Sequence, residues 1–506
     1  MEGISHESAS FAGHNKLDNL IVFYDNNKIT IDGKLSLAMS ENVGRRFSAY
    51  GWHVQNVKNV NDLSELKNAV TAAQKEKNKP SFIVVNTHIG YGSPNKQDTA
   101  GIHGSPLGED EVKLTKRNLG WPEDKTFYIP QDVFEHYNSI KRIGAEKQTA
   151  WLKIFQEYSQ KFPEEAKLFT NVFNGEYGDE WKKKLPKFEN WNEKVATRSA
   201  SGKVLNAIAD SLPTLIGGSA DLAPSNNTNL KNYTAFSAFD YGGRNFHFGI
   251  REHAMAGILN GMALYGGVIP YGATFLVFAD YLRPSIRLAS LSPLRPIYVF
   301  THDSIGLGED GPTHQPVEQL ASLRTIPGLV VIRPADANET AYAWRAALEY
   351  KGGPVALVLT RQGVPVIDRT KYSNTEGVLK GAYVIKECQG HPDLILIASG
   401  SEVSLALSAA EELEKVGKNI RVVNFASWEL FEMQSDDYKE TVLPKNVKAR
   451  LSIEAGVRQG WEKYVGDGGN SISIEKFGAS APEKVLFEKY GFTVEEIIKK
   501  AFAIIR

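Results

Sequence analysis

The chain has 506 residues, of which 42% are hydrophobic and 23% charged, which excludes a mainly disordered or collagen-like protein. With 58 Lys and Arg against 59 Asp and Glu, the formal net charge of −1 gives no reason to expect a nucleic-acid partner. The single cysteine, Cys388, excludes an internal disulfide, and no apolar run reaches the roughly 18 residues of a membrane helix. These properties predict a cytoplasmic protein of about three domains, without a membrane partner.

The first part of the chain has an α/β pattern. Residues 20–24 and 81–86 are short apolar runs typical of buried parallel strands, and residues 62–77 between them favour a helix. Strands that alternate with helices indicate a parallel sheet. Residues 87–130 are rich in Gly, Pro, Ser and Asn, so we expect a long loop region there, of a kind that often carries function.

The rest of the chain contains a helical, charged linker and two further α/β blocks. Strands are expected at 214–217, 296–300, 329–332, 355–359, 394–398 and 420–424, and a helix at 402–416. We therefore predict three α/β domains with parallel or mixed sheets. Their bounds are 1–135, 191–365 and 380–506, with a linker at 136–190.

The segment 24–33 follows the first predicted strand, where α/β sheets bind ligands. The amide oxygen of Asn27 and the main-chain carbonyl of Ile29 are hard oxygen ligands of the kind that Mg²⁺ prefers. A plain turn rich in Asn and Asp explains the same residues without a metal.

The glycine-rich segment 90–108 contains His103. Glycine lets a ligand approach the backbone closely, and a histidine there can donate to phosphate or move a proton. An ordinary surface histidine is the alternative. We expect His88, which continues a strand end, to be structural or to face solvent.

The triplet Arg-Glu-His at 251–253 opens a helix of small residues. A partly desolvated Glu252 could share a proton with a heterocyclic nitrogen. Alternatively, Glu252 forms an ion pair at the helix N-terminus, where a carboxylate complements the helix dipole.

The segment 301–316 has two histidines and three acidic residues in a glycine-rich loop after the predicted strand 296–300. Packing alone does not explain this composition, and we favour a functional interpretation.

These four segments, in this order, resemble the transketolase family over all 506 residues. The most specific matches are GSADLAPSN at 218–226, GIREHAM at 249–255 and THDSIGLGEDGPTHQP at 301–316. The resemblance implies a transketolase-like fold with a diphosphate-binding, a pyrimidine-binding and a C-terminal domain. It also implies transfer of a two-carbon ketol unit from a ketose phosphate, such as xylulose 5-phosphate, to an aldose phosphate, such as ribose 5-phosphate. The reaction of the family is reversible, runs through a carbanion of thiamine diphosphate and belongs to the pentose phosphate pathway.

The resemblance assigns roles to individual residues. Asn27 and Ile29 match ligands of Mg²⁺ or Ca²⁺, and the implied catalytic residues are Glu252, His103 and His314. Thiamine diphosphate is bound in the family by residues matching Asn27, His103, Glu252, Phe275, Phe278 and Tyr281. Spacing alone places the last three in a core. The sugar phosphates are bound by residues matching His103, Arg198, Ser225, His302, Asp310, His314 and Arg361.

The match also raises doubts and alternatives. The family has a Gly-Asp-Gly segment, with a third metal ligand, just before the part that matches Met1, so the resemblance implies that the first domain, 1–135, is incomplete. Its absence predicts weak binding of Mg²⁺-diphosphate and an exposed apolar sheet edge. One alternative is a non-catalytic, truncated chain, and another is one half of a split enzyme that a second chain completes.

A nearer alternative is another thiamine-diphosphate transferase, such as dihydroxyacetone synthase or deoxyxylulose-phosphate synthase. Arg198, Ser225 and Arg361 together favour transketolase. The resemblance also implies a homodimer, because the cofactor of the family lies between subunits. Glu2 and Glu7 match acids that link the two active sites of such a dimer.

Overall fold

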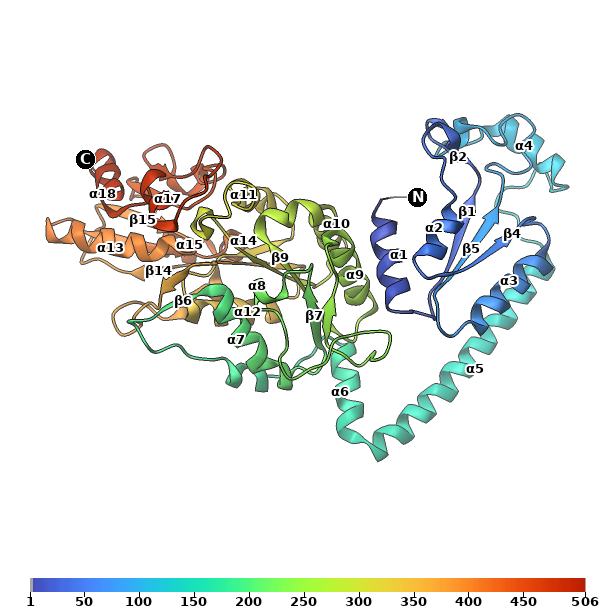
Figure 1. Cartoon of the computed structure of the whole chain (residues 1–506), viewed down its shortest axis with the longest axis horizontal. Coiled ribbons are helices and arrows are strands. Elements are labelled where there is room, and N and C mark those ends of the chain that lie inside the picture. Colours follow the sequence, from blue (N-terminus) through green and yellow to red (C-terminus); the bar gives the residue numbers. More distant parts are fainter. Residues whose placement is uncertain (1–2, 506) are drawn as a thin grey trace. The chain divides into compact units, whose positions relative to one another are not determined.

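The computed structural model describes residues 3–505, so the predicted role of Glu2 lies outside the described residues. The chain divides into two compact units, residues 1–168 and 169–506, and each is described by itself. Figure 1 shows their elements. Within residues 3–505 no helix combines the length and the apolarity needed to cross a bilayer.

The first unit contains a three-stranded parallel sheet with the strand order β1-β5-β4. Its strands are β1 (Ile21–Asn26), β4 (His53–Val57) and β5 (Ser81–Asn86). Helices α1 (Ile4–His14) and α2 (Val43–Ala49) contribute to the core on one face, and α3 (Leu63–Lys75) to the core on the other. β1 is an edge strand, and Phe23 on it is half exposed.

The part of this unit after β5 is mostly loop and helix. The short hairpin β2 (Ile29–Thr30) and β3 (Gly33–Lys34) follows β1, and η2 (Ala100–Ile102) lies in the predicted loop region. The helix α4 (Glu109–Asn118) interrupts that region, for which the sequence predicts only loop. The predicted helical linker is formed by α5 (Gln131–Lys161) and α6 (Pro163–Phe173).

The first sheet of the second unit has six strands in the order β11-β12-β10-β9-β7-β8, and all its strand pairs are parallel. The strands are β7 (Leu215–Ser219), β8 (Asn245–His247), β9 (Ile269–Phe275), β10 (Ile297–Thr301), β11 (Val330–Ile332) and β12 (Val355–Leu359). One face packs on α7 (Thr197–Ile208) and α12 (Ala337–Glu349). The alternate side chains of β10 face α9 (Glu252–Tyr265), where the Tyr298 hydroxyl donates to Asn260, and α9 packs on α10 (Ala279–Leu291).

The second sheet of this unit has five strands in the order β14-β16-β15-β17-β18, with only β14 antiparallel to its neighbour. The strands are β14 (Ala382–Lys386), β15 (Leu394–Ala398), β16 (Ile420–Phe425), β17 (Arg450–Ile453) and β18 (Asn470–Ile472). Helices α13 (Glu402–Lys415) and α18 (Val494–Ile504) pack against each other beside it.

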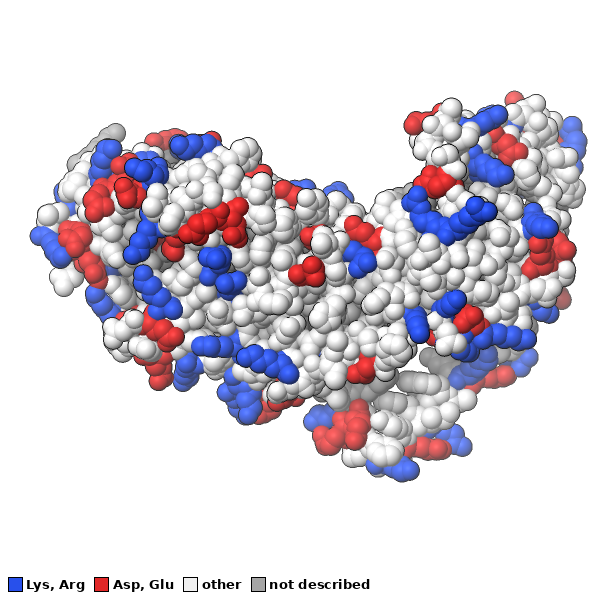
Figure 2. Space-filling model, viewed as in Figure 1, with Lys and Arg blue, Asp and Glu red and all other residues white. Residues whose placement is uncertain are grey.

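Figure 2 shows acidic and basic side chains interspersed over the visible face of the chain, in keeping with its balanced charge.

Candidate active site

The turn after β1 is the predicted metal-binding segment. The Asn27 side-chain oxygen accepts the N–H of Ile29 at 3.0 Å, and Lys28 between them has a φ of 62°. This is an Asx turn, as the alternative interpretation expects, but an amide oxygen keeps a second lone pair that can bind a cation. Within residues 3–505, no cluster of three or more His, Cys, Asp or Glu could hold a metal ion. A metal site at this turn would therefore depend on amide and carbonyl oxygens together with its ligand.

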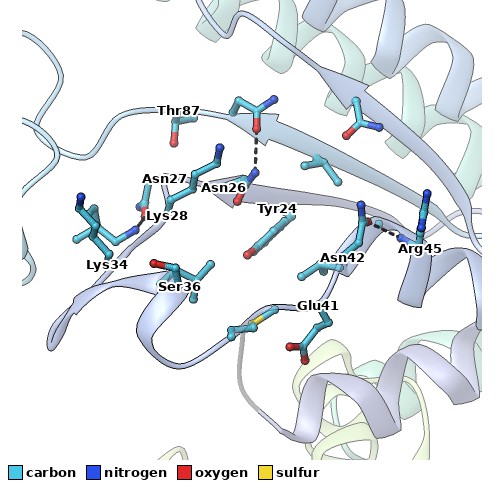
Figure 3. A pocket seen from close by; sticks show the side chains of 18 of the residues that line it. Tyr24, Asn26, Asn27, Lys28, Lys34, Ser36, Glu41, Asn42, Arg45 and Thr87 are labelled. Carbon is cyan, nitrogen blue, oxygen red and sulfur yellow. Dashed lines mark hydrogen bonds between the residues drawn. The ribbon is translucent and has the colours of Figure 1, made fainter.

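A cavity of about 1060 Å³ opens beside this turn (Figure 3). Asn26 and Asn27 line it, and the Asn26 amide donates to the Asn86 side chain at 2.8 Å. Its basic lining residues are Lys28, Lys34 and Arg45, and its acidic lining residues are Glu41 and Asp98. His88 and Tyr24 also line it. Three basic side chains and several amides suit an anionic ligand such as a diphosphate.

His88 and His103 lie on the loop region after β5. His88 is exposed, as predicted, and its Nδ1 is 2.9 Å from a carboxylate oxygen of Asp98. His103 is also exposed and follows η2. Glu111 of α4 anchors this region, because it accepts the Ser93 hydroxyl and both the main-chain and side-chain N–H groups of Asn95. These bonds, the Ser93 hydroxyl first, lower the pKa of Glu111 below its usual value.

The predicted aromatic residues form a platform that runs from the interior to the surface of the second unit. Phe275 ends β9 and is buried, and its ring stacks on Phe278 with a centroid distance of 5.8 Å. Phe278 in turn lies 5.9 Å from Tyr281, which is 62% exposed. The assignment of this stripe to a core, which spacing alone suggested, is therefore wrong for its outer part, because α10 turns Tyr281 toward solvent.

His302 lies directly on this platform. Its ring stacks on Phe275 with a centroid distance of 3.6 Å, and its backbone has a φ of 61°, which a non-glycine residue rarely adopts. Its Nδ1 is 2.8 Å from the Thr301 hydroxyl, which accepts a hydrogen bond from Asn226 at 2.7 Å. Burial, followed by the positive charge of Arg198, lowers the pKa of His302 to about 3. The imidazole is therefore neutral at neutral pH, and its Nε2 can donate to an anion once Thr301 donates to Nδ1.

Two arginines lie near His302. Arg198 stands in the first turn of α7, where its Nη1 donates to the Ser225 carbonyl at 2.7 Å. Its Nε is buried and has no hydrogen-bond partner within residues 3–505, which leaves a donor for a ligand. Burial, followed by the charge of Arg361, lowers the pKa of the Arg198 guanidinium. The start of α7 is tied to the end of β12, because the Thr360 side chain accepts the N–H of Thr197 at 3.0 Å.

The remaining predicted residues of this unit surround the same platform or begin α9. His314 is half-buried against Phe278, with ring centroids 5.7 Å apart, and its Nδ1 is 2.9 Å from the Thr313 hydroxyl. Asp310 is exposed on the same loop, and Glu252 is buried at the first position of α9. Asn226, which bonds Thr301, was not predicted, although its position next to Ser225 in the GSADLAPSN segment is a signal for it.

The low pKa of His302 predicts a pH dependence of stability. In the unfolded chain His302 takes up a proton near its ordinary pKa of 6.5, whereas in the folded chain it does so only near pH 3. The free energy of unfolding therefore falls as the pH drops below 6.5. At about 1.4 kcal/mol per pH unit, the wild type should lose roughly 2 kcal/mol more than His302→Asn between pH 7 and pH 5. Urea unfolding at both values measures this, with the exposed His391→Asn as control. Equal losses in wild type and His302→Asn would contradict it.

Three family models match the chain in succession. They describe the thiamine diphosphate binding domain of transketolase (residues 1–178), its pyrimidine binding domain (193–366) and a transketolase-like C-terminal domain (381–493). The transketolase of Aquifex aeolicus is 53% identical over 500 residues, which cover 99% of this chain and 72% of that protein. The chain belongs to the transketolase family. The transketolase of Halalkalibacterium halodurans is 52% identical over 505 residues, covering 100% of this chain and 76% of that protein.

Solved transketolases have the same fold. The structure of transketolase from Leishmania mexicana matches with a TM-score of 0.95 and 42% identity, covering 100% of this chain and 74% of that one. A transketolase from Pichia stipitis in complex with sedoheptulose 7-phosphate also matches with a TM-score of 0.95, at 40% identity, covering 100% of this chain and 74% of that one. The predicted α/β fold class is confirmed.

These relationships decide between the alternatives. The chain is a transketolase, a transferase of a family that uses thiamine diphosphate with a divalent metal ion. The prediction of a second chain that completes a split enzyme is not supported, because the relatives match 99% to 100% of this chain. The non-catalytic chain and the other transferases find no support either, because these relatives are all transketolases.

Proposed function

We propose that this transketolase transfers a two-carbon ketol unit between sugar phosphates through the residues described above. The observation that carries the proposal is the neutral, buried His302, stacked on Phe275 beside the guanidinium of Arg198. A planar, permanently charged guanidinium suits the phosphate of a sugar. Neutral histidine adds a hydrogen-bond donor without a charge that must be desolvated.

The substrate-binding residues follow from this arrangement. Arg198, Arg361, His302 and Ser225 bind the phosphate, and the unpartnered Nε of Arg198 supports this role. Asp310, exposed on the same loop as His314, recognises a sugar hydroxyl, while His314 holds the oxygens of the donor. His103 would contact both cofactor and donor.

The cofactor-binding residues are proposed on the same grounds. The aminopyrimidine would stack on the platform of Phe275, Phe278 and Tyr281, and Glu252 would exchange a proton with its ring nitrogen. Asn27 and the Ile29 carbonyl would hold Mg²⁺ or Ca²⁺, and the basic lining of the neighbouring cavity suits the diphosphate. When bound, thiamine diphosphate supplies the electron sink for carbon–carbon cleavage.

Calorimetric titration of thiamine diphosphate with Mg²⁺ into the purified chain tests the cofactor site. We expect measurable binding that weakens at least tenfold in Asn27→Ala. Asn59→Ala is a matched control, because the Asn59 side chain accepts the N–H of Asn61 in an equivalent turn at 3.1 Å. A folded wild-type chain that binds neither this cofactor nor ribose 5-phosphate would overturn the proposed site.

A homodimer is the second part of the proposal. Large apolar side chains on α9 and α10 are exposed, including Leu264, Tyr265 and Leu291 at 73%, 82% and 68%. Exposed apolar surface of this kind is typical of protein–protein interfaces. The predicted roles of Glu2 and Glu7 in linking two active sites depend on the dimer. The predicted domain bounds and the cytoplasmic location also stay predictions.

Sedimentation at micromolar concentration should show a dimer that Tyr265→Asp shifts toward the monomer. Burying a carboxylate in an apolar interface is costly, which is the reason for this expectation. Val416→Asp is the control, because Val416 is 62% exposed beside the second sheet and should leave the assembly unchanged. A wild-type chain that sediments as a monomer contradicts the dimer.

A further inference from the structure

We call residues 302–316 the substrate loop and residues 380–506, which contain the second sheet, the second-sheet block. A segment of the second-sheet block is hydrogen-bonded to the substrate loop. This segment, residues 478–482, lies between β18 and α17 (Glu483–Lys489), and we call it the latch segment. The Ser480 hydroxyl donates to the Glu309 carbonyl at 2.6 Å. The Gln315 side-chain amide donates to the Ala479 carbonyl and to the Gly308 carbonyl, each at 2.9 Å. The buried Gln315 amide therefore makes one hydrogen bond within the substrate loop and one to the latch segment.

The fit between the two segments is close. A methyl group placed on Gly478 would lie 1.7 Å from the side-chain oxygen of Gln315, whose amide nitrogen is fixed by two carbonyls. Gly311, which has a φ of 78°, would bring a methyl group to 3.4 Å from the Ser480 side chain. Glycines on both sides of the seam allow the two backbones to approach this closely.

The other end of the substrate loop is fixed by Arg333, which follows β11 of the first sheet and links the loop to the second-sheet block. Asp303, directly after His302, accepts from the Arg333 Nε at 2.9 Å, and Arg333 also pairs with Glu402 at the start of α13. All three side chains are fully buried. The loop is thus anchored near Asp303 and again at Gln315, and its exposed Asp310 and half-buried His314 lie between these anchors.

We propose that the latch segment positions the substrate loop for sugar-phosphate recognition, and that Gln315 and Ser480 are positioning residues that act through Asp310 and His314. The inference rests on the proposed function of those two residues. The latch segment is hydrogen-bonded to the loop at Glu309 and Gln315, directly beside Asp310 and His314, and it approaches the loop closely between Ile305 and Gln315. Its loss should therefore affect sugar binding more than cofactor binding.

Gln315→Glu is the main test, because it keeps the shape of the side chain and replaces the donor with a carboxylate facing two carbonyl oxygens. We expect the KM for both sugar phosphates to rise about tenfold, with a smaller change in kcat and with the thiamine diphosphate affinity within about twofold of wild type. Amide hydrogen exchange in residues 304–316 should become faster. Gln434→Glu is the matched control, because Gln434 makes the same kind of bond to the Leu430 carbonyl, at 2.8 Å, elsewhere in the block.

Two further variants test the latch from its own side. Ser480→Ala should raise the KM about threefold, whereas Ser480→Thr keeps the hydroxyl and should restore it. Gly478→Ala should displace the Gln315 amide and reproduce the effect of Gln315→Glu. These variants also carry the test if Gln315→Glu fails to fold.

The outcomes are separable from those of the proposed function. If the wild type transfers ketol units but Gln315→Glu keeps its KM, or Gln434→Glu raises it equally, the latch inference is wrong. A folded wild type without activity would refute the proposed function. The amide exchange rates in residues 304–316 would then be the only test of whether the latch segment positions the loop. Unchanged exchange in both Gln315→Glu and Gly478→Ala overturns the positioning role.

Discussion

Replacing Arg333 with leucine should lower the free energy of unfolding by about 3–5 kcal/mol, because it leaves two buried carboxylates without their cation. Arg333 is completely buried and binds Asp303, Glu402 and the Ser399 carbonyl, which accepts from its Nη1 at 2.9 Å. Burial, the largest influence, already raises the pKa of Glu402 above its usual value, even though Arg333 opposes the shift. Without Arg333 this opposition disappears.

The pH dependence of the loss identifies its cause. In Arg333→Leu the folded chain keeps a proton on the Glu402 carboxyl, which the unfolded chain releases near pH 4.5, so the stability of the variant falls as the pH rises above that value. We expect a larger loss at pH 7.5 than at pH 5, measured by urea unfolding. Arg458→Leu is the control, because Arg458 forms an exposed pair with Glu462 at 3.1 Å and should cost less than about 1 kcal/mol. Similar losses in the two variants would refute the argument.

A double variant separates the missing cation from the missing packing. Arg333→Leu combined with Glu402→Leu removes one of the stranded carboxylates and should recover part of the loss. A double variant less stable than Arg333→Leu would mean that Glu402 stabilises the fold by contacts other than this ion pair.

The sequence identifies those strands whose apolar residues form continuous runs. The strands β10, β12 and β15 are buried on both faces, so nearly every residue in them is apolar and the pattern is visible. The strand β9 is equally buried but contains Pro270, Gly272 and Thr274, and its burial depends on neighbours that the sequence does not show. The sequence analysis therefore predicts no strand at 269–275 and places its last residue, Phe275, only in an aromatic stripe assigned to a core.

The sequence predicts which residues belong to the candidate site, but it does not predict how these residues are arranged in space. His302 meets Phe275 because β9 and β10 pair in parallel with Thr301 opposite Phe275, a register that no local pattern fixes. Arg198 comes close to Arg361 through the bonds of Thr197 to Thr360, 163 residues away. The low pKa of His302 follows from this assembly, since it depends on burial and on two distant arginines.

Glu252→Gln should lower kcat by about 10²- to 10⁴-fold, the usual contribution of a general acid–base residue. Glutamine keeps the volume of the buried side chain at the start of α9 and one hydrogen-bond acceptor, so the fold and most of the cofactor affinity should survive. It cannot take up and release a proton, however, and the proposed exchange with the aminopyrimidine fails. Steady-state kinetics with saturating thiamine diphosphate, together with calorimetric titration of the cofactor, separate the two effects.

The same variant also decides between the two interpretations of Glu252. A glutamate that only complements the helix dipole contributes about 0.3–1 kcal/mol of stability and nothing to kcat. Glu462, the first residue of α16 (Glu462–Val465), is exposed and makes only surface contacts, a pair with Arg458 and a hydrogen bond from the Gly460 N–H, so Glu462→Gln should show a small loss of stability and unchanged kinetics. If Glu252→Gln behaves like Glu462→Gln, its burial at the start of α9 has a structural role and the proton must be exchanged elsewhere. A large loss of kcat in Glu252→Gln alone assigns the exchange to this carboxylate, because the two variants make the same chemical change at the start of a helix.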